Sequence, residues 1–249
     1  MKSDKEKLFD IFKKNIEPWI EIPSAKELSE WNHENRIIYN QRNRHIAKMY
    51  FFQTVFDFLT DNRINGDYYE FGTHRCRTFR MVLSEARKHN LENMNFYAFD
   101  SFEGLPKRDA EDDSIEKWQS GALTTSEENF MAMLNEHGLY LDKIKSIKGF
   151  FENSLNDNLI QKFDENKSNA ALINIDCDFY KSAIPVFNFI ENFLQIGTVI
   201  YIDDMYAGYK GQKSKGVAKA FYEYKKNSKW QFEDYLNIGW FGKSFIVQG

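Results

Sequence analysis

Short apolar runs alternate with amphipathic segments over most of the chain. The runs cover residues 68–72, 95–100, 143–149, 170–176 and 198–204. Apolar residues at helical spacing follow them, up to about residue 89 and then over residues 125–137, 182–195 and 215–226. Two further runs, near "WQFEDY" and "KSFIVQ", close the chain. Because strands separated by helices form βαβ units, the pattern predicts an α/β fold whose mostly parallel sheet has helices on both faces.

The first sixty or so residues are predicted to be helical. Leu8, Ile11, Phe12 and Ile16 fall at helical spacing, and prolines at 18 and 23 end that pattern. A longer helix is expected over residues 35–60, with one apolar face formed by Ile46, Met49, Phe52, Phe56 and Leu59. The division expected from this pattern is a helical extension over residues 1–62, serving as a lid or dimer contact, and a catalytic domain over residues 63–249.

Basic residues are concentrated in the first half of the longer predicted helix. They are Arg36, Arg42, Arg44, His45 and Lys48. Two interpretations stay open for them: a solvated helix surface, or a lid or partner-facing surface.

Composition limits the class of protein further. The chain has 249 residues and a formal charge of -4, which argues against nucleic acid as the main partner. Its two cysteines, Cys76 and Cys177, form neither a disulfide framework nor a zinc pattern. No leader segment and no run of about 18 apolar residues is found, so a cytoplasmic protein without a membrane segment is predicted.

Aspartates stand where two of the predicted strands end. Asp176 follows one apolar run, and Asp203 and Asp204 follow the next. A right-handed crossover would place these strands side by side, about 5 Å apart. Three carboxylates that close repel one another unless a cation lies among them, and oxygen ligands suit Mg²⁺, Mn²⁺ or Ca²⁺. A metal site is therefore predicted, although a cap or a turn would explain any one aspartate alone.

Three further residues lie at or near strand ends. Asp178, two positions beyond Asp176, is a candidate general base beside a metal-bound hydroxyl, or an N-cap of the following helix. Gly72 allows a close turn after the first strand. Asp100 ends the second strand and is a candidate to hold the two hydroxyls of a ribose, or to form an Asx turn.

Five segments of the chain, taken together, carry a resemblance. They are "DYYEFGTHRCRTFR", "YAFDSFEGLP", "KGFFENSL", "INIDCDFYKS" and "VIYIDD". As a set they resemble the macrocin O-methyltransferase family, metal-dependent enzymes that use S-adenosylmethionine to methylate sugar hydroxyls. The resemblance runs from about Asp67 to Asp204 and is looser at "NRHIAKMYFFQTVFDFL" and over the last forty or so residues.

This resemblance implies a seven-stranded, Rossmann-like class I methyltransferase sheet. It also implies S-adenosylmethionine-binding residues along the first three strand ends. They are Glu70, Gly72 and Thr73 for the methionine part, Asp100 and Ser101 for the ribose, and Gly149 and Phe150 near the adenine. Asp176, Asp203 and Asp204 match the metal ligands, for Mg²⁺ or Mn²⁺, and Asp178 matches the base. The family usually has a glycine where this chain has Cys76.

Other functions stay open at this point. A D-x-D motif at a strand end also occurs in metal-dependent glycosyltransferases, and a catalytically inactive cofactor-binding subunit would keep the same fold. The expected partner is a small hydroxylated acceptor, most simply a sugar, and a homo-oligomer is compatible with the helical extension. Residues 205–216 and 107–123 are candidate flaps over the acceptor.

Overall fold

The computed structural model describes residues 3, 6, 23–108 and 119–249. The helix expected around Leu8 to Ile16 lies outside these residues. The chain divides into two compact units, Met1–His45 and Ile46–Gly249. The functional division expected between residues 62 and 63 stays a prediction.

The first unit contains α2 (Ala25–Ser29) and the beginning of α3 (His33–Asp61). α2 begins with a capping box, in which the Ser24 side chain accepts from the Glu27 backbone and the Glu27 carboxylate accepts from the Ser24 backbone. This reciprocal pair satisfies two backbone N–H groups that a helix start otherwise leaves without partners.

The second unit contains one seven-stranded sheet within the described residues, in the order β3-β2-β1-β4-β5-β7-β6. Its strands are β1 (Asp67–Phe71), β2 (Phe96–Asp100), β3 (Ile144–Lys148), β4 (Ala170–Ile175), β5 (Val199–Ile202), β6 (Gln231–Ile238) and β7 (Gly242–Gln248). The first five are parallel, whereas β7 runs antiparallel to both β5 and β6. The predicted sheet, seven-stranded and mostly parallel, is confirmed.

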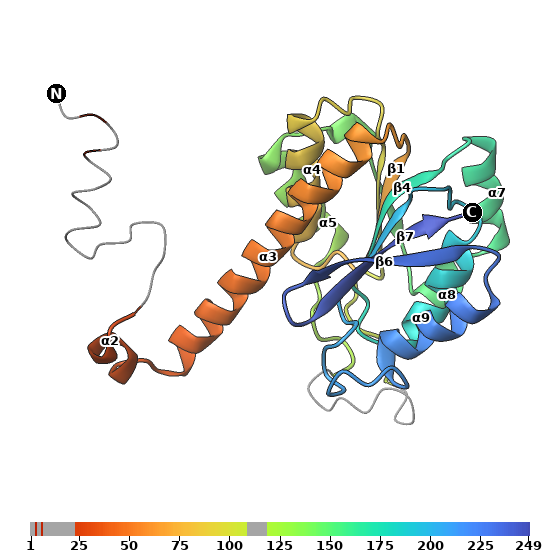
Figure 1. The fold of residues 1–249 in the computed structure, drawn as a ribbon. Coiled ribbons are helices and arrows are strands. Elements are labelled where there is room, and N and C mark those ends of the chain that lie inside the picture. Colours follow the sequence, from red (N-terminus) through yellow and green to blue (C-terminus); the bar gives the residue numbers. More distant parts are fainter. Residues whose placement is uncertain (1–2, 4–5, 7–22, 109–118) are drawn as a thin grey trace. The chain divides into compact units, whose positions relative to one another are not determined.

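Helices cover both faces of this sheet (Figure 1). One face carries the second part of α3 with α4 (Arg77–Lys88) and α5 (Glu127–His137). The other carries α7 (Asp157–Glu165), α8 (Tyr180–Ile190) and α9 (Gly216–Asn227). Two short elements, η1 (Leu141–Lys143) and α6 (Phe151–Ser154), flank β3. The order of elements predicted from the pattern is therefore observed.

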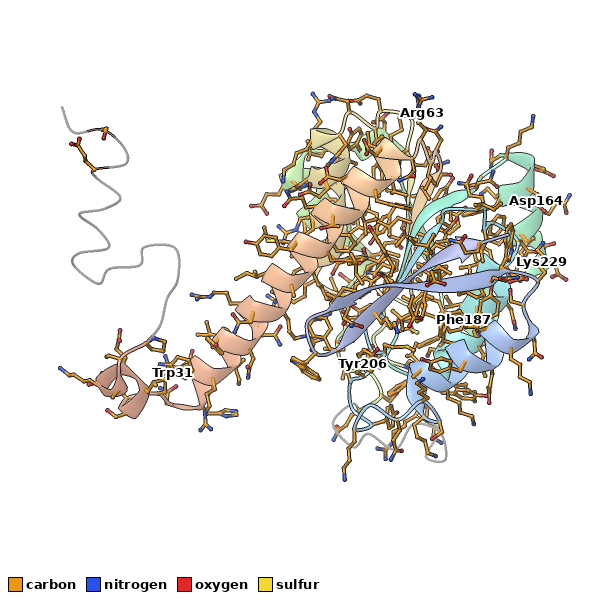
Figure 2. All side chains as sticks on the ribbon, viewed as in Figure 1. Trp31, Arg63, Asp164, Phe187, Tyr206 and Lys229 are labelled. Atoms are coloured by element: carbon orange, nitrogen blue, oxygen red, sulfur yellow. The ribbon has the colours of Figure 1, made fainter. Side chains whose placement is uncertain are left out.

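Two apolar cores separate the sheet from its helices. Successive residues of a strand point to opposite faces, so Tyr68 belongs to the core under α3, α4 and α5, and Tyr69 to the core under α8 and α9. Figure 2 shows side chains filling both layers. Phe187, labelled there on α8, stacks on Tyr224 of α9 with ring centroids 5.1 Å apart. β1 and β4 are buried along their whole length, as a sheet covered on both faces requires.

The buried stripe of α3 differs from the predicted one. Phe52, Phe56 and Leu59 are buried as expected, but Ile46 and Met49 are 40% and 55% exposed. The stripe instead passes through Lys48, Phe51 and Val55. At about 100° per residue, Ile46 points about 150° away from the centre of this stripe, and Met49 lies just beyond its edge, about 90° from the centre. The observed stripe matters for function, because it places a lysine, Lys48, in the interior.

None of the helices in the described part of the chain is long and apolar enough to cross a membrane.

Candidate active site

The carboxyl ends of the five parallel strands meet at one edge of the sheet. The strand order runs outward from β1 through β2 to β3 on one side, and from β4 to β5 on the other. The strand order therefore reverses between β1 and β4, which is where open α/β sheets bind ligands. The predicted cofactor residues follow β1, β2 and β3 or end these strands, and the predicted metal ligands follow β4 and β5.

Asp176, Asp203 and Asp204 converge at this edge. One carboxylate oxygen from each lies within 4.8 Å of the others. Backbone hydrogen bonds fix two of these positions, because the Asp176 N–H donates to Phe71 at 2.9 Å and the Asp203 N–H donates to Ile175 at 2.9 Å. The convergence expected from neighbouring strand ends is thus present, with Asp203 buried and the other two half-buried.

Asp178 lies next to this cluster. Its backbone N–H donates to Asp204 Oδ2 at 3.2 Å, which joins the loops that follow β4 and β5. Its φ of 59° is left-handed, and the N-cap of α8 is Phe179. Asp178 therefore does not serve as the N-cap, and its proposed role as a base stays a prediction.

Lys48 completes the cluster, and its place there was not predicted. Its Nζ lies 2.8 Å from Asp203 Oδ1 and 3.1 Å from Asp176 Oδ2. The expectation of a solvated surface is wrong for this residue, since its side chain is only 7% exposed. Burial by itself lowers the pKa of Lys48, but the charges of Asp176 and Asp203 outweigh burial and raise the pKa above its usual value. The signal in the sequence is its position four residues before Phe52, on the apolar stripe.

Glu70 and Asn174 extend the polar cluster into the core. Glu70 is 1% exposed, and burial raises the pKa of its carboxyl to about 8, against the opposing effect of a hydrogen bond from the Tyr68 hydroxyl. Asn174 is fully buried, and neither polar atom of its side chain has a hydrogen bond of ordinary geometry. Glu70 is thus held inside the protein near Lys48 and Asp176, and its predicted contact with the cofactor stays a prediction.

Asp100 organises the loops after β1 and β2. Its Oδ2 accepts from the Thr73 N–H at 2.7 Å and from the His74 N–H at 3.3 Å. Its Oδ1 accepts from the Phe102 N–H at 2.8 Å, which is the Asx turn considered above. A carboxylate oxygen has two lone pairs, so the turn leaves acceptor capacity for a ribose hydroxyl.

Ser101, Gly149 and Phe150 lie around the end of β2 and β3. The Ser101 hydroxyl donates to the Gly104 carbonyl at 2.8 Å and so shapes its own loop. The Gly149 N–H donates to the Asp100 carbonyl at 2.9 Å, and the half-buried Phe150 is the N-cap of α6. These residues share one edge with Asp100, as expected, but the Ser101 hydroxyl is directed into its own loop.

The loop from Gly72 to Cys76 has an unusual backbone. Gly72 has φ +89°, and a Cβ there would lie 1.9 Å from the Asp176 carbonyl oxygen. Cys76 has φ 59°, a left-handed conformation that favours glycine. Cys76 is fully buried, and burial raises the pKa of its thiol to about 12.

The three aspartates suit a divalent cation by their chemistry. Oxygens bound to one Mg²⁺ lie at most about 4.2 Å apart, twice the metal–oxygen distance. The aspartate oxygens lie within 4.8 Å of one another, so they would need to move only slightly to bind one ion. Three ionised aspartates carry three negative charges and Lys48 offsets one, which leaves the two that a divalent ion would balance. The donor set therefore fits Mg²⁺ or Mn²⁺.

One predicted flap, residues 205–216, begins directly after Asp204. Met205 is buried, and the Tyr206 N–H donates to the Phe241 carbonyl at 2.9 Å. The first residues of this segment are therefore held against the turn between β6 and β7. The other predicted flap, residues 107–123, lies partly outside the described residues. Its described flanks pair with each other through the Leu105 N–H and the Ala122 carbonyl at 2.9 Å.

Comparison with known proteins gives a family match. The family model described as Macrocin-O-methyltransferase (TylF) matches residues 44–245, a range that contains Lys48 and every predicted site residue. No curated protein sequence matches the chain.

Solved structures share the fold at low sequence identity. CalS11, a calicheamicin methyltransferase, has a TM-score of 0.66 at 14% identity, over 99% of this chain and 94% of its own. The O-methyltransferase NovP has a TM-score of 0.64 at 16% identity, over 82% and 81%. TomG from Streptomyces achromogenes, solved with S-adenosylmethionine, has a TM-score of 0.50 at 10% identity, over 100% of both chains. The shared fold is the class I methyltransferase sheet.

Proposed function

Since this chain belongs to the macrocin O-methyltransferase family, we propose that it methylates a hydroxyl group of a sugar or a similar small molecule. The methyl donor is S-adenosylmethionine, and the reaction uses a divalent cation held by Asp176, Asp203 and Asp204. The observation that carries this proposal is the convergence of these three carboxylates at the point where the strand order reverses.

The cofactor would lie along the ends of β1, β2 and β3, in contact with the loops at Gly72, Thr73, Asp100, Gly149 and Phe150. Asp100 suits the ribose because its carboxylate is already fixed by backbone N–H groups. Ser101 would act through the loop that its hydroxyl stabilises, and Glu70, inside β1, by direct contact. The acceptor would then bind beyond the ends of β4 and β5, beside the proposed metal ligands.

The chain's own residues would supply the positions and the base. Asp176, Asp203 and Asp204 would hold a divalent cation, and the chemistry it would supply there is to lower the pKa of an acceptor hydroxyl. Asp178 would take the proton from that hydroxyl, and the oxygen would then form a bond to the methyl carbon as the bond from carbon to the sulfonium sulfur breaks. The products are the methyl ether, S-adenosylhomocysteine and a protonated Asp178.

The sugar assignment is supported by the family and by one neighbour. CalS11 is described as a TDP-rhamnose 3'-O-methyltransferase of calicheamicin biosynthesis. The glycosyltransferase alternative has no support from the family match. Residues 1–62 remain a proposed lid or dimer contact.

Transfer of a labelled methyl group tests the proposal. We would incubate the protein with methyl-labelled S-adenosylmethionine and a panel of nucleotide-linked sugars, free glycosides and catechols, in Mg²⁺ and in EDTA. Label should enter at least one acceptor, and only in Mg²⁺. Asp178→Asn should lower the rate by about 100-fold or more, whereas Asp234→Asn, in an ion pair with Lys243 on the β6–β7 ribbon, should leave it unchanged.

Three outcomes would contradict the proposal. Equal transfer in EDTA would remove the metal from the mechanism. Binding of S-adenosylmethionine without transfer to any acceptor would favour the inactive subunit, and stabilisation by nucleotide sugars with glycosyl transfer would favour the glycosyltransferase.

A further inference from the structure

Lys48 is a buried positive charge that the proposed mechanism does not use. It comes from α3, 128 positions before Asp176 in the chain, and it reaches the carboxylates through an apolar environment. Its neighbours Phe51 and Phe52 are buried, and its Nζ lies 5.9 Å from the ring centroids of both Tyr201 and Phe241. A charged group in such a place needs partners, and here the partners are two of the proposed metal ligands.

Lys48 bridges these two aspartates. Asp203 Oδ1 accepts from both Lys48 and the Tyr201 hydroxyl, and Asp176 Oδ2 accepts from Lys48. Lys48 therefore fixes the orientation of both carboxylates.

We propose that Lys48 is a permanent internal cation of the metal site, which holds Asp176 and Asp203 in position without metal and weakens the binding of a divalent ion. The inference rests on the proposed metal site. It assigns Lys48 a positioning role, since the residue acts through the aspartates.

Two opposite effects on the protein follow from one charge. Without metal, Lys48 offsets the repulsion among three carboxylates within 4.8 Å of one another, so its removal should destabilise the metal-free protein. With metal, the ammonium group and the divalent ion repel each other, so its removal should tighten metal binding. Even at the dielectric constant of bulk water, the repulsion between a single and a double charge about 4 Å apart changes a binding constant by about tenfold or more.

Calorimetric titration of Mg²⁺ into Lys48→Met tests this, with the protein saturated with S-adenosylhomocysteine. Methionine has a similar length and suits the apolar surroundings. We expect Mg²⁺ to bind the variant at least about tenfold more tightly than the wild type, and thermal unfolding in EDTA to begin at a lower temperature. The matched control is Lys225→Met on α9, which removes a lysine bonded to the Phe232 carbonyl and should leave Mg²⁺ affinity unchanged.

If Lys48→Met does not fold, a charge-compensated double variant still tests the proposal. Lys48→Met/Asp203→Asn removes both members of the closer ion pair, so in EDTA it should be more stable than Lys48→Met alone. If it is not, the counter-charge role is overturned.

The outcomes separate this inference from the proposed function. Equal or weaker Mg²⁺ binding by Lys48→Met, with normal binding by the wild type, would overturn the role of Lys48 and leave the metal site standing. Binding of Mg²⁺ by Lys48→Met but not by the wild type would support the proposed repulsion between Lys48 and the ion. If neither protein bound Mg²⁺ or Mn²⁺ although both bound S-adenosylhomocysteine, the proposed metal site itself would fail, and the inference with it.

Discussion

Glu70 is a buried acid whose environment differs strongly from water. It faces Tyr68 on its own strand, Lys48 from α3, Asp176 after β4 and Cys76 in the loop before α4. Burial is the largest effect and raises its pKa from 4.5 to about 8, while the hydrogen bond from Tyr68 and the charge of Lys48 act in the opposite direction. Near neutral pH, the folded protein therefore keeps a proton on Glu70 that the unfolded chain releases.

We expect Glu70→Gln to change how stability depends on pH. The folded wild type binds this proton up to about pH 8, but the unfolded chain loses it above 4.5. Between these values the wild type loses stability as the pH rises, by up to about 1.4 kcal/mol per pH unit. Glutamine accepts the same hydrogen bond from Tyr68 without titrating, so the variant should become the more stable protein towards pH 8.

Urea unfolding between pH 4 and pH 8.5, in EDTA, measures this difference. The wild type and the variant should differ least at the acidic end, where both side chains are neutral. A difference in free energy of unfolding that stays constant over the whole range would show that Glu70 does not hold a proton in the folded state.

At the residue level, the sequence identified one part of the site and missed another. Asp176, Asp203 and Asp204 could be predicted because each directly follows an apolar strand, and neighbouring strands bring their ends together. Lys48 could not be placed in this way, because its partners are fixed by the packing of α3 on the sheet. Asn174 was also missed, since a polar residue inside a buried strand carries no local signal of what it faces.

The elements β1 and β4 determine how closely the two halves of the site approach. Gly72 lies where the chain leaving β1 passes the end of β4, and the Asp176 carbonyl oxygen fills the space that a side chain would need. A glycine at this point therefore has a structural reason beyond any contact with a cofactor. It lets the loop after β1 and the first proposed metal ligand lie against each other.

We expect Gly72→Ala to lower the free energy of unfolding by about 2–5 kcal/mol, because it combines overpacking with a strained backbone. Gly138→Ala, after α5, is a matched control. Gly138 also has a positive φ, +75°, but the nearest atom to its added Cβ is 3.9 Å away, so only the backbone cost of about 1–2 kcal/mol remains. Urea unfolding of both variants gives the comparison, and equal losses would contradict the close approach.

Among the elements, strands were predicted better than helix faces. Each of the five parallel strands was found close to its expected residues, and four of them, β1, β2, β4 and β5, are short and largely buried runs. The apolar face of α3 was assigned to Ile46 and Met49 in part, and these residues are exposed. With apolar residues on several sides of that helix, spacing alone does not decide which ones pack on the sheet.

At the level of the whole molecule, the alternation of strands and helices determined the architecture, whereas it did not determine the strand order. The order β3-β2-β1-β4-β5 follows from the rule of right-handed crossovers only once the reversal between β1 and β4 is known. The resemblance to the macrocin O-methyltransferase family implied the type of sheet, and the structure supplied the position of the reversal. With it, seven predicted cofactor residues and three predicted metal ligands fall on one edge of one sheet.

Binding of metal and cofactor to the same protein is the sharpest test of the proposed site. Mg²⁺ would be titrated calorimetrically into the chain saturated with S-adenosylhomocysteine, for the wild type and for Asp203→Asn/Asp204→Asn. We predict one ion per chain for the wild type, none for the variant, and the same affinity for S-adenosylhomocysteine in both, since Asp100 and the β1–β3 loops are unchanged. Equal metal binding by the two proteins would show that the aspartates after β5 are not the ligands, and the proposed metal site would be wrong.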